Sequence, residues 1–201
     1  MVEMRPDLEI ISRWIRPDSS VLDLGCGDGA LLQSLKDDQG IRGYGLEIDS
    51  ENVTSCIKKG INVIQTDIEA GLSDFDANSF DYVIMTQTIQ AINDPVKVIH
   101  EMLRVGREAI VTFPNFGYWQ CRFDLVFKGR MPVNDALPNF WYNTPNIHLC
   151  TIADFERLAK KEGVKIMQRS VVDRKHKNNI RTKIWPNFFA EIALYRFCKA
   201  Y

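Results

Sequence analysis

Strand-like apolar segments alternate with amphipathic helical segments through the first 115 residues of this 201-residue chain. Apolar runs between turn signals predict buried strands at residues 20–25, 43–49, 62–68, 79–87 and 108–115. Apolar residues at helical spacing predict helices at residues 7–15, 30–38, 51–60 and 95–106. Strands that alternate with helices form a parallel sheet whose two faces the helices cover. The pattern therefore predicts an α/β fold with a doubly wound, mostly parallel sheet.

The pattern changes after Pro114. Residues 115–148 are rich in aromatic, proline and asparagine residues, and only about 117–128 could form a helix. We interpret this segment as a cap inserted over the carboxyl edge of the sheet.

Regular elements return after the cap. Thr151 and Asp154 have the spacing of a capping box for a helix over 154–163. Two further strands, 165–173 and 189–197, are separated by a loop, which favours antiparallel neighbours with the last strand reversed. We expect one domain over residues 1–201, with the cap at 115–148.

Composition limits the classes of partner. The chain is 45% hydrophobic with a formal net charge of -1, which predicts a water-soluble domain and gives no electrostatic reason to expect nucleic acid or an anionic membrane as partner. It lacks an apolar run of the roughly 20 residues that a membrane span needs. The five cysteines are scattered without a CxxC pair, so we expect no disulfide framework and no metal site, and a cytoplasmic location.

The stretch VLDLGCGDG, residues 21–29, predicts a ligand site. In a doubly wound sheet, ligands bind at the carboxyl ends of the strands, where the winding reverses. Gly25, Gly27 and Gly29 allow a tight turn and a close approach of the backbone to a ligand. Three alternating glycines exceed what a turn alone requires.

Two ligand classes fit this loop. Gly25, Gly27 and Ala30 match the dinucleotide pattern G-x-G-x-x-G/A, and Glu47 lies about 20 residues on, where an acid that binds ribose is expected. A nicotinamide enzyme is therefore one interpretation. In the other, the segment from Asp23 to Gly29 resembles the D-x-G-x-G-x-G loop of class I S-adenosylmethionine-dependent methyltransferases, whose fold is Rossmann-like.

Three observations favour the methyltransferase resemblance. Asp23 lies inside the strand end, where its carboxylate could orient the loop or meet the cationic amino-acid part of the ligand. A helix precedes the first strand, as is usual in methyltransferases. Asp67 ends the third predicted strand, where this family places an acid or amide near the adenine amino group.

The resemblance implies a role for each matched residue. Glu47 would bind both ribose hydroxyls, because a carboxylate can accept two hydrogen bonds. Ile48 would pack on the adenine, and Asp67 and Ile68 would flank its other edge. Thr86 and Gln87 would lie near the methionine part and the transferable methyl. The cofactor-binding set is Asp23, Gly25, Cys26, Gly27, Gly29, Glu47, Ile48, Asp67, Ile68, Thr86 and Gln87.

The second half of the chain narrows the resemblance. FPNFGYWQCRFDLVFKGRMPV (113–133), followed by ALPNFWYNTPNIHLCTIADF (136–155), resembles MetW, the methyltransferase-fold family of methionine biosynthesis. The resemblance runs from Arg5 to about residue 177, and WYNTPNIHLCT is its most specific phrase. It implies a site for S-adenosylmethionine or S-adenosylhomocysteine. It also implies, as partner, a homoserine O-acyltransferase whose activity the MetW protein supports.

No signature identifies a catalytic residue. The N/D-P-P-Y phrase of amide and ring-nitrogen methyltransferases is missing, and TQTIQ stands after the fourth predicted strand. Among the histidines, His148 could face the pocket as a base, whereas His100 is expected to pack and His176 to lie in a solvated charged loop.

The cap supplies candidates for contact with a substrate or a partner. Its aromatic residues could enclose a small acceptor, anchor a protein partner or form the cap's own small core. A basic run over residues 174–183 is expected to be a solvated loop or a rim for an acidic partner. The cap candidates are Asn115, Tyr118, Trp119, Trp141, Tyr142 and His148.

Two functions remain open at this point. The chain could be an accessory subunit of the acyltransferase, with a nucleotide site that is structural or senses the downstream product of the pathway. Alternatively, it could methylate a small metabolite, with the cap closing over the acceptor.

Overall fold

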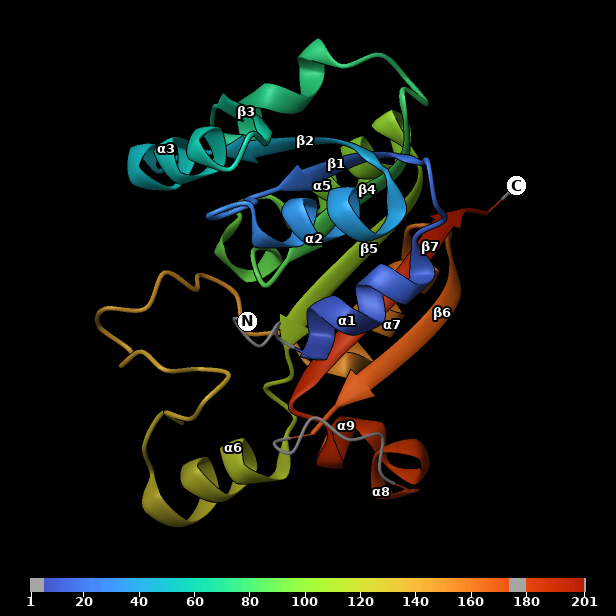
Figure 1. The fold of residues 1–201 in the computed structure, drawn as a ribbon. Coiled ribbons are helices and arrows are strands. Elements are labelled where there is room, and N and C mark those ends of the chain that lie inside the picture. Colours follow the sequence, from blue (N-terminus) through green and yellow to red (C-terminus); the bar gives the residue numbers. More distant parts are fainter. Residues whose placement is uncertain (1–5, 174–179, 201) are drawn as a thin grey trace.

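A seven-stranded mixed sheet forms the centre of the molecule (Figure 1). The computed structural model describes residues 6–173 and 180–200. The strand order is β3-β2-β1-β4-β5-β7-β6, so the winding reverses between β1 and β4. The strands are β1 (Ser20–Leu24), β2 (Arg42–Glu47), β3 (Asn62–Gln65), β4 (Phe80–Thr86), β5 (Gly106–Pro114), β6 (Val164–Val172) and β7 (Ile192–Lys199).

The predicted direction of the last strand is confirmed. Strands β1 to β5 pair in parallel, whereas β7 is antiparallel to both of its neighbours, β5 and β6. The short helices α8 (Ile180–Ile184) and α9 (Pro186–Phe189) precede β7. Strand β7 therefore starts later than the predicted residue 189, because Pro186 occupies the first turn of α9, where proline is well tolerated.

The helices pack on both faces of the sheet, as the alternation predicts. On one face lie α1 (Pro6–Trp14), α2 (Ala30–Gln39) and α3 (Ser50–Lys58); on the other lie α5 (Pro95–Val105) and α7 (Ile152–Lys161). The side chains of β4 alternate between the two cores, with Tyr82 and Ile84 on the α1 face and Val83 and Met85 on the α5 face. All four side chains are buried, and complete burial of such side chains contributes about 1.5–3 kcal/mol each.

Two helix starts show how single side chains set element boundaries. Thr151 caps α7, because its hydroxyl oxygen accepts a hydrogen bond from the Asp154 N–H at 3.2 Å, and the helix begins at Ile152. Strand β3 ends at Gln65, earlier than the predicted residue 68. The reason is that Asp67 caps the short helix α4 (Ile68–Gly71) by accepting from the Glu69 N–H at 2.9 Å.

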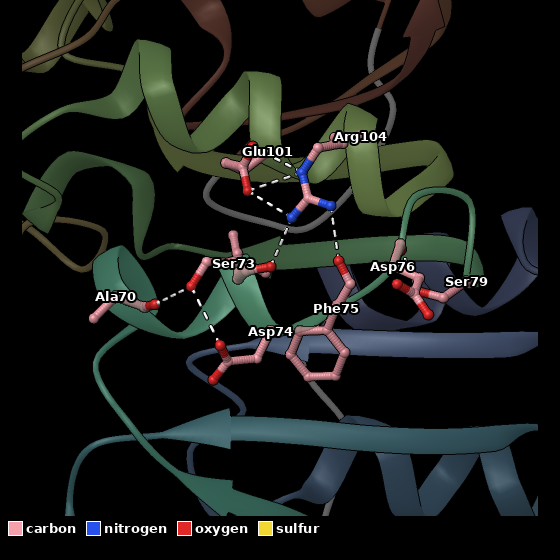
Figure 2. Close-up of polar contacts among 9 residues, drawn as sticks. Ala70, Ser73, Asp74, Phe75, Asp76, Ser79, Glu101 and Arg104 are labelled. Atoms are coloured by element: carbon pink, nitrogen blue, oxygen red, sulfur yellow. Dashed lines mark hydrogen bonds and ion pairs between the residues drawn. The ribbon is translucent and has the colours of Figure 1, made fainter.

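An arginine on α5 fixes the connection from β3 to β4. Figure 2 shows the Arg104 guanidinium between α5 and this connection. It donates to the carbonyl oxygens of Leu72 and Phe75, each at 2.7 Å, and to the Glu101 carboxylate. The hydrogen bond from Arg104 lowers the pKa of Glu101. The connection is thereby held against the helix that covers it.

The cap follows β5 and extends away from the sheet (Figure 1). The helix predicted over 117–128 forms as α6 (Trp119–Phe123) and a π-helical turn, η3 (Asp124–Lys128). Tyr118, Cys121 and Leu137 form a small buried cluster against Phe116. The rest of the cap is largely irregular in structure.

The basic loop, His100 and membrane-spanning helices are three further points on which the sequence makes a prediction. Part of the predicted basic loop, residues 174–177 with His176 among them, lies outside the described residues. His100 is half-exposed rather than packed, because its Nε2 lies 3.0 Å from Glu162 Oε2 beyond the end of α7. Over residues 6–173 and 180–200, the structure contains no helix that is both long and apolar enough to cross a membrane.

Candidate functional site

A pocket of about 380 Å³ lies at the carboxyl ends of β1, β2 and β3. It brings together five of the residues that the sequence predicts, from three different strand ends, with five that it does not. The lining residues are Gly25, Glu47, Ile48, Asp67, Ile68, Glu69, Thr88, Ala91, Ile92 and Asn93.

The glycine loop forms one wall of this pocket. Gly25, Gly27 and Gly29 have φ angles of 72°, 55° and 77°, in the left-handed region where glycine carries no steric penalty. The N–H groups of Gly25 and Cys26 donate to Leu46 O at 2.8 and 3.1 Å, which ties the loop to β2. A side chain at Gly25 would stand 3.0 Å from the Thr88 hydroxyl. The glycines therefore set the path of the loop and its distance from the segment after β4.

Glu47 lies at the end of β2 and is 8% exposed. Its Oε2 accepts a hydrogen bond from the Gly27 N–H at 2.8 Å, and its Oε1 accepts from the N–H groups of Ile48 and Asp49 at 2.9 and 3.0 Å. A carboxylate has about four acceptor positions, so one remains. The free position is on Oε2, so a ribose that donates two hydroxyls to Glu47 would need one of these three N–H groups to give up its bond.

The two flanks of the pocket differ in polarity. Ile48, which is 65% exposed, and buried Ile68 offer apolar surface to a flat ligand. Asp67 is exposed on the rim, and one of its oxygens caps α4. An aromatic base between two isoleucines, a ribose at a buried carboxylate and an amino group at a second carboxylate fit this donor set. The residues present thus fit an adenosine group.

Two unpredicted residues close the pocket on the side of the cap. The Asn93 N–H donates to Glu69 Oε1, and the Asn93 amide donates to Glu69 Oε2 at 3.2 Å. Thr88 lies opposite Gly25 on the wall. Glu69 lies in the short helix α4 and Asn93 in the loop before α5, and both segments are too short for periodicity to single these residues out. Thr88, in contrast, stands in the TQT phrase that follows β4.

Six predicted cofactor residues do not line the pocket: Gly27 and Gly29 of the glycine loop, Asp23, Cys26, Thr86 and Gln87. Asp23 is buried inside β1, and Thr86 ends β4. Gln87 has a φ of 52°, uncommon for a residue other than glycine, and its amide donates to Asp7 of α1 at 3.3 Å. The Cys26 sulfur lies 3.9 Å from that of Cys56, and burial raises the pKa of the Cys26 thiol, which suits a packing role rather than a nucleophile.

The buried cap candidates are committed to the fold. The Asn115 amide donates to Ala190 O at 2.8 Å and to Asn187 O at 3.2 Å, and its oxygen accepts from the N–H groups of Gly117 and Ile152. All four of its hydrogen-bonding positions are therefore in use. Tyr118 is buried in the small cluster of the cap.

The remaining cap candidates are exposed. Trp119, Trp141 and Tyr142 are 42%, 73% and 68% exposed. His148 is also exposed, and its Nε2 lies 3.3 Å from the carbonyl oxygen of Asn93, a residue of the pocket wall. None of these four side chains lines the pocket around Glu47.

One short segment contacts both the pocket and the cap. The carbonyl oxygen of Gln90 accepts hydrogen bonds from the N–H groups of Ile147 and His148 at 2.8 and 2.9 Å. The Gln90 side chain is buried, and its amide donates to Gln87 O at 3.1 Å. Because residues 91–93 line the pocket, we name residues 89–93 the linking segment.

The chain is similar to proteins of methionine biosynthesis. The family model described as "Methionine biosynthesis protein MetW" matches residues 5–197. The "Bifunctional methionine biosynthesis protein MetXA/MetW" of Rhodopirellula baltica is 38% identical over 98% of this chain, and this chain spans 33% of that protein. "Phosphoethanolamine N-methyltransferase 2" of Caenorhabditis elegans is 27% identical over 122 residues, which cover 56% of this chain and 28% of that protein.

Solved structures resemble the whole fold. An S-adenosylmethionine-dependent methyltransferase from Mesorhizobium loti has a TM-score of 0.69 at 13% identity, covering 98% of this chain and 99% of that one. A possible histamine N-methyltransferase from Thermotoga maritima has a TM-score of 0.66 at 16% identity, covering 96% of this chain and 87% of that one. At these identities the likeness concerns the fold alone. The fold is that of class I methyltransferases.

Proposed function

The chain belongs to the MetW family of methionine-biosynthesis proteins, and from this we propose that it is an accessory subunit of a homoserine O-acyltransferase. We further propose that it binds S-adenosylmethionine or S-adenosylhomocysteine in the pocket around Glu47. The observation that carries the first part is the relative from Rhodopirellula baltica, whose name places MetXA and MetW in one protein. Covalent linkage raises the effective concentration of one unit near the other, an advantage for units that work together.

The lining of the pocket supports the second part. Glu47 would accept a hydrogen bond from the ribose, Ile48 and Ile68 would hold the adenine between them, and Asp67 would accept from its amino group. Glycine at position 25 keeps this wall of the pocket free of a side chain next to Thr88.

The linking segment supports a regulatory role for the nucleotide. A ligand can change the affinity for a partner only if it favours one conformation over another. Residues 91–93 would contact the nucleotide, and Gln90 holds the backbone of the cap at Ile147 and His148. Ordering of this segment by a ligand would therefore also restrict the cap.

Methyl transfer to a small metabolite is the second candidate. It is favoured by the partial similarity to a phosphoethanolamine N-methyltransferase, which covers 56% of this chain. Transfer from a sulfonium requires alignment of donor and acceptor more than it requires a base, so proximity can supply much of the rate. In this case the cap would close over the acceptor.

Calorimetry tests the nucleotide site. Glu47→Ala should weaken the binding of S-adenosylhomocysteine about 100-fold, because the charge-assisted hydrogen bond from the ribose is lost, and such a bond is worth about 1.5–3 kcal/mol. Asp28→Asn is the matched control. Asp28 belongs to the same loop, but its carboxylate pairs with Lys59 at 2.6 Å instead of lining the pocket. Equal affinity of the Glu47 variant and the parent protein would contradict the assignment of the ribose acid.

Mixing the chain with the acyltransferase of its own organism tests the biological role. We expect co-elution of the two proteins and a changed rate of acyl transfer. The absence of both a complex and a change in the rate of acyl transfer would contradict the accessory role. Accumulation of S-adenosylhomocysteine with a defined small acceptor, in the absence of the acyltransferase, would instead favour the second candidate.

A further inference from the structure

The cap exposes an unusual amount of apolar side-chain surface. Of the nineteen large apolar side chains that are exposed among the described residues, twelve lie between Trp119 and Leu149. Phe127 and Trp141 are 74% and 73% exposed. The twelve are Trp119, Phe123, Leu125, Val126, Phe127, Met131, Val133, Phe140, Trp141, Tyr142, Ile147 and Leu149. Concentrations of this kind mark interaction sites on soluble proteins.

Part of this surface encloses a hollow of about 720 Å³, which we name the cap groove. The groove combines aromatic side chains, those of Phe140, Trp141 and Tyr142, with the basic side chains of Lys128 and Arg130. Its lining consists of Asp124, Lys128, Gly129, Arg130, Met131, Val133, Phe140, Trp141 and Tyr142. It is separate from the pocket around Glu47, with which it shares no lining residue.

The backbone around the groove is also unusual. Residues 124–128 form a π-helical turn, a feature that occurs frequently at functional sites. Gly129 ends this turn in the left-handed conformation, with its N–H donating to Asp124 O. The turn leaves Val126 and Phe127 each 74% exposed, although a regular amphipathic helix would bury such residues.

The cap's own core does not account for these side chains. Its buried cluster consists of Tyr118, Cys121 and Leu137. Phe140 and Tyr142 stack on each other with ring centroids 5.6 Å apart, yet they are 52% and 68% exposed. Their rings are therefore fixed relative to each other while most of their surface stays in contact with water. Rigid aromatic groups of this kind are typical anchors of protein interfaces.

The charge at the rim of the groove is positive. Asp124 is buried and pairs with Lys128 at 2.6 Å, so these two charges compensate each other. Arg130 is exposed and forms no ion pair within residues 6–173 and 180–200. The groove thus offers a partner apolar surface bordered by an uncompensated guanidinium, which pairs with carboxylates in bidentate fashion.

We propose that the cap groove is the docking site for the homoserine O-acyltransferase. The acyltransferase would insert an apolar side chain among Phe140, Trp141 and Tyr142 and place a carboxylate at Arg130. This inference rests on the proposed function, since that function supplies the partner. It also fits the position of the linking segment, because Ile147 and His148 join the cap to the wall of the nucleotide pocket.

The shape and charge of the groove argue against a second copy of this chain as occupant. A two-fold dimer brings the same patch of both subunits together. Two hollows would then face each other with nothing to fill them, and the two Arg130 side chains would lie on the same interface. A protruding, acidic segment of a different protein fits the groove better.

Three variants test the docking site, with binding to the purified acyltransferase measured by biolayer interferometry. Trp141→Ala should weaken binding at least 30-fold, as truncation of an interface anchor does. Arg130→Glu should weaken it about tenfold and reduce its dependence on salt concentration. Ile57→Ser is the control. Ile57 is 64% exposed on α3, far from α6 in Figure 1, and its variant should bind within twofold of the parent.

The affinity for S-adenosylhomocysteine should be the same in the parent and all three variants, which shows that the fold is intact. If Trp141→Ala also disturbs nucleotide binding, Arg130→Glu and Tyr142→Ser decide the question, because both replace exposed side chains. Parent-like binding of the acyltransferase by these groove variants would overturn the inference and leave the proposed function standing. Failure of the parent to bind the acyltransferase would overturn both. A parent dimer that Trp141→Ala converts to monomer would identify a second copy as the occupant and overturn the docking site.

Discussion

The pocket around Glu47 and the cap use the chain in opposite ways. In the pocket, backbone groups fix the geometry: the N–H groups of Gly27, Ile48 and Asp49 all donate to a single buried carboxylate. In the cap, side chains dominate, and most of its large aromatic side chains are exposed. The first region is complete within the chain except for its ligand. The cap has a small core, and many of its apolar side chains are exposed.

This difference indicates what each region is for. A site assembled from the ends of parallel strands inherits its precision from the sheet, because the register of β1, β2 and β4 places Gly25, Glu47 and Thr88 together. A surface made of irregular backbone and aromatic side chains derives its order from whatever it contacts. The comparison therefore fits the two roles that we propose, binding of a small ligand in the pocket and docking of a large partner on the cap.

Two glycines provide the sharpest contrast in stability. Gly29 and Gly129 both adopt left-handed conformations, with φ of 77° and 58°. A Cβ at Gly29 would stand 2.9 Å from the Cys56 sulfur, whereas at Gly129 it would meet nothing within 4 Å. Gly29→Ala should lower the free energy of unfolding by about 3 kcal/mol, from backbone strain and overpacking. Gly129→Ala should lower it by about 1 kcal/mol, from strain alone.

Urea denaturation at pH 7 measures both values. Calorimetry adds a second readout, since Gly29→Ala should weaken nucleotide binding and Gly129→Ala should leave it unchanged. Equal losses of stability in the two variants would show that the loop is no more tightly packed than the cap.

The same contrast explains how far the sequence predicts the molecule. Apolar runs predict the strands, and the glycine pattern with Glu47 and Asp67 predicts a ligand site at their carboxyl ends, because both features follow from backbone geometry that repeats in every parallel sheet. The pattern could not reveal the hydrogen bonds between Glu69 and Asn93, which join the short helix α4 to the loop before α5. It also could not show that Cys26 turns away from the pocket, since the direction of a loop side chain depends on its tertiary neighbours.

In the cap, the sequence predicted the helix over 117–128 but not which aromatic residues are buried. Tyr118 and Trp119 are adjacent and similar in chemistry, yet one is 5% and the other 42% exposed. Their difference arises from contacts with Cys121 and Leu137, and the segment lacks the regular periodicity that would place them on one face. The family resemblance implies the partner that we propose, and the structure adds the groove.

Hydrogen exchange tests whether the two regions are connected. The linking segment lines the pocket and accepts hydrogen bonds from the Ile147 and His148 N–H groups. Saturation with S-adenosylhomocysteine should slow exchange of these two amides about tenfold, which corresponds to roughly 1.4 kcal/mol of local stabilisation. Amides of β6, at the edge of the sheet opposite β3, serve as the internal control and should not change. Protection confined to the pocket wall would mean that ligand and cap are independent.

The smallest expected effect concerns acid stability and the position of the ionised carboxylates. Among the described residues, the carboxyl groups with a clearly lowered pKa are those of Asp28, Asp81, Glu101 and Glu162, all outside the cap. A fall in pH below about 4 should therefore weaken the region of the sheet before it weakens the cap.

Asp81 provides the specific test, because its Oδ2 accepts hydrogen bonds from the N–H and the hydroxyl of Ser20, each at 2.9 Å, and so joins the starts of β1 and β4. These bonds, led by the backbone one, lower its pKa below the ordinary value of 3.8. Such a group contributes stability that is complete above about pH 4 and is lost as the pH falls through the lowered pKa. Asp81→Asn should therefore lower the free energy of unfolding by about 1 kcal/mol at pH 7, and the difference from the parent should shrink below pH 4. Urea denaturation over this pH range measures the difference in the free energy of unfolding between the variant and the parent. A difference that persists unchanged at pH 3 would show that packing, rather than the ionised carboxylate, holds the two strands at this point.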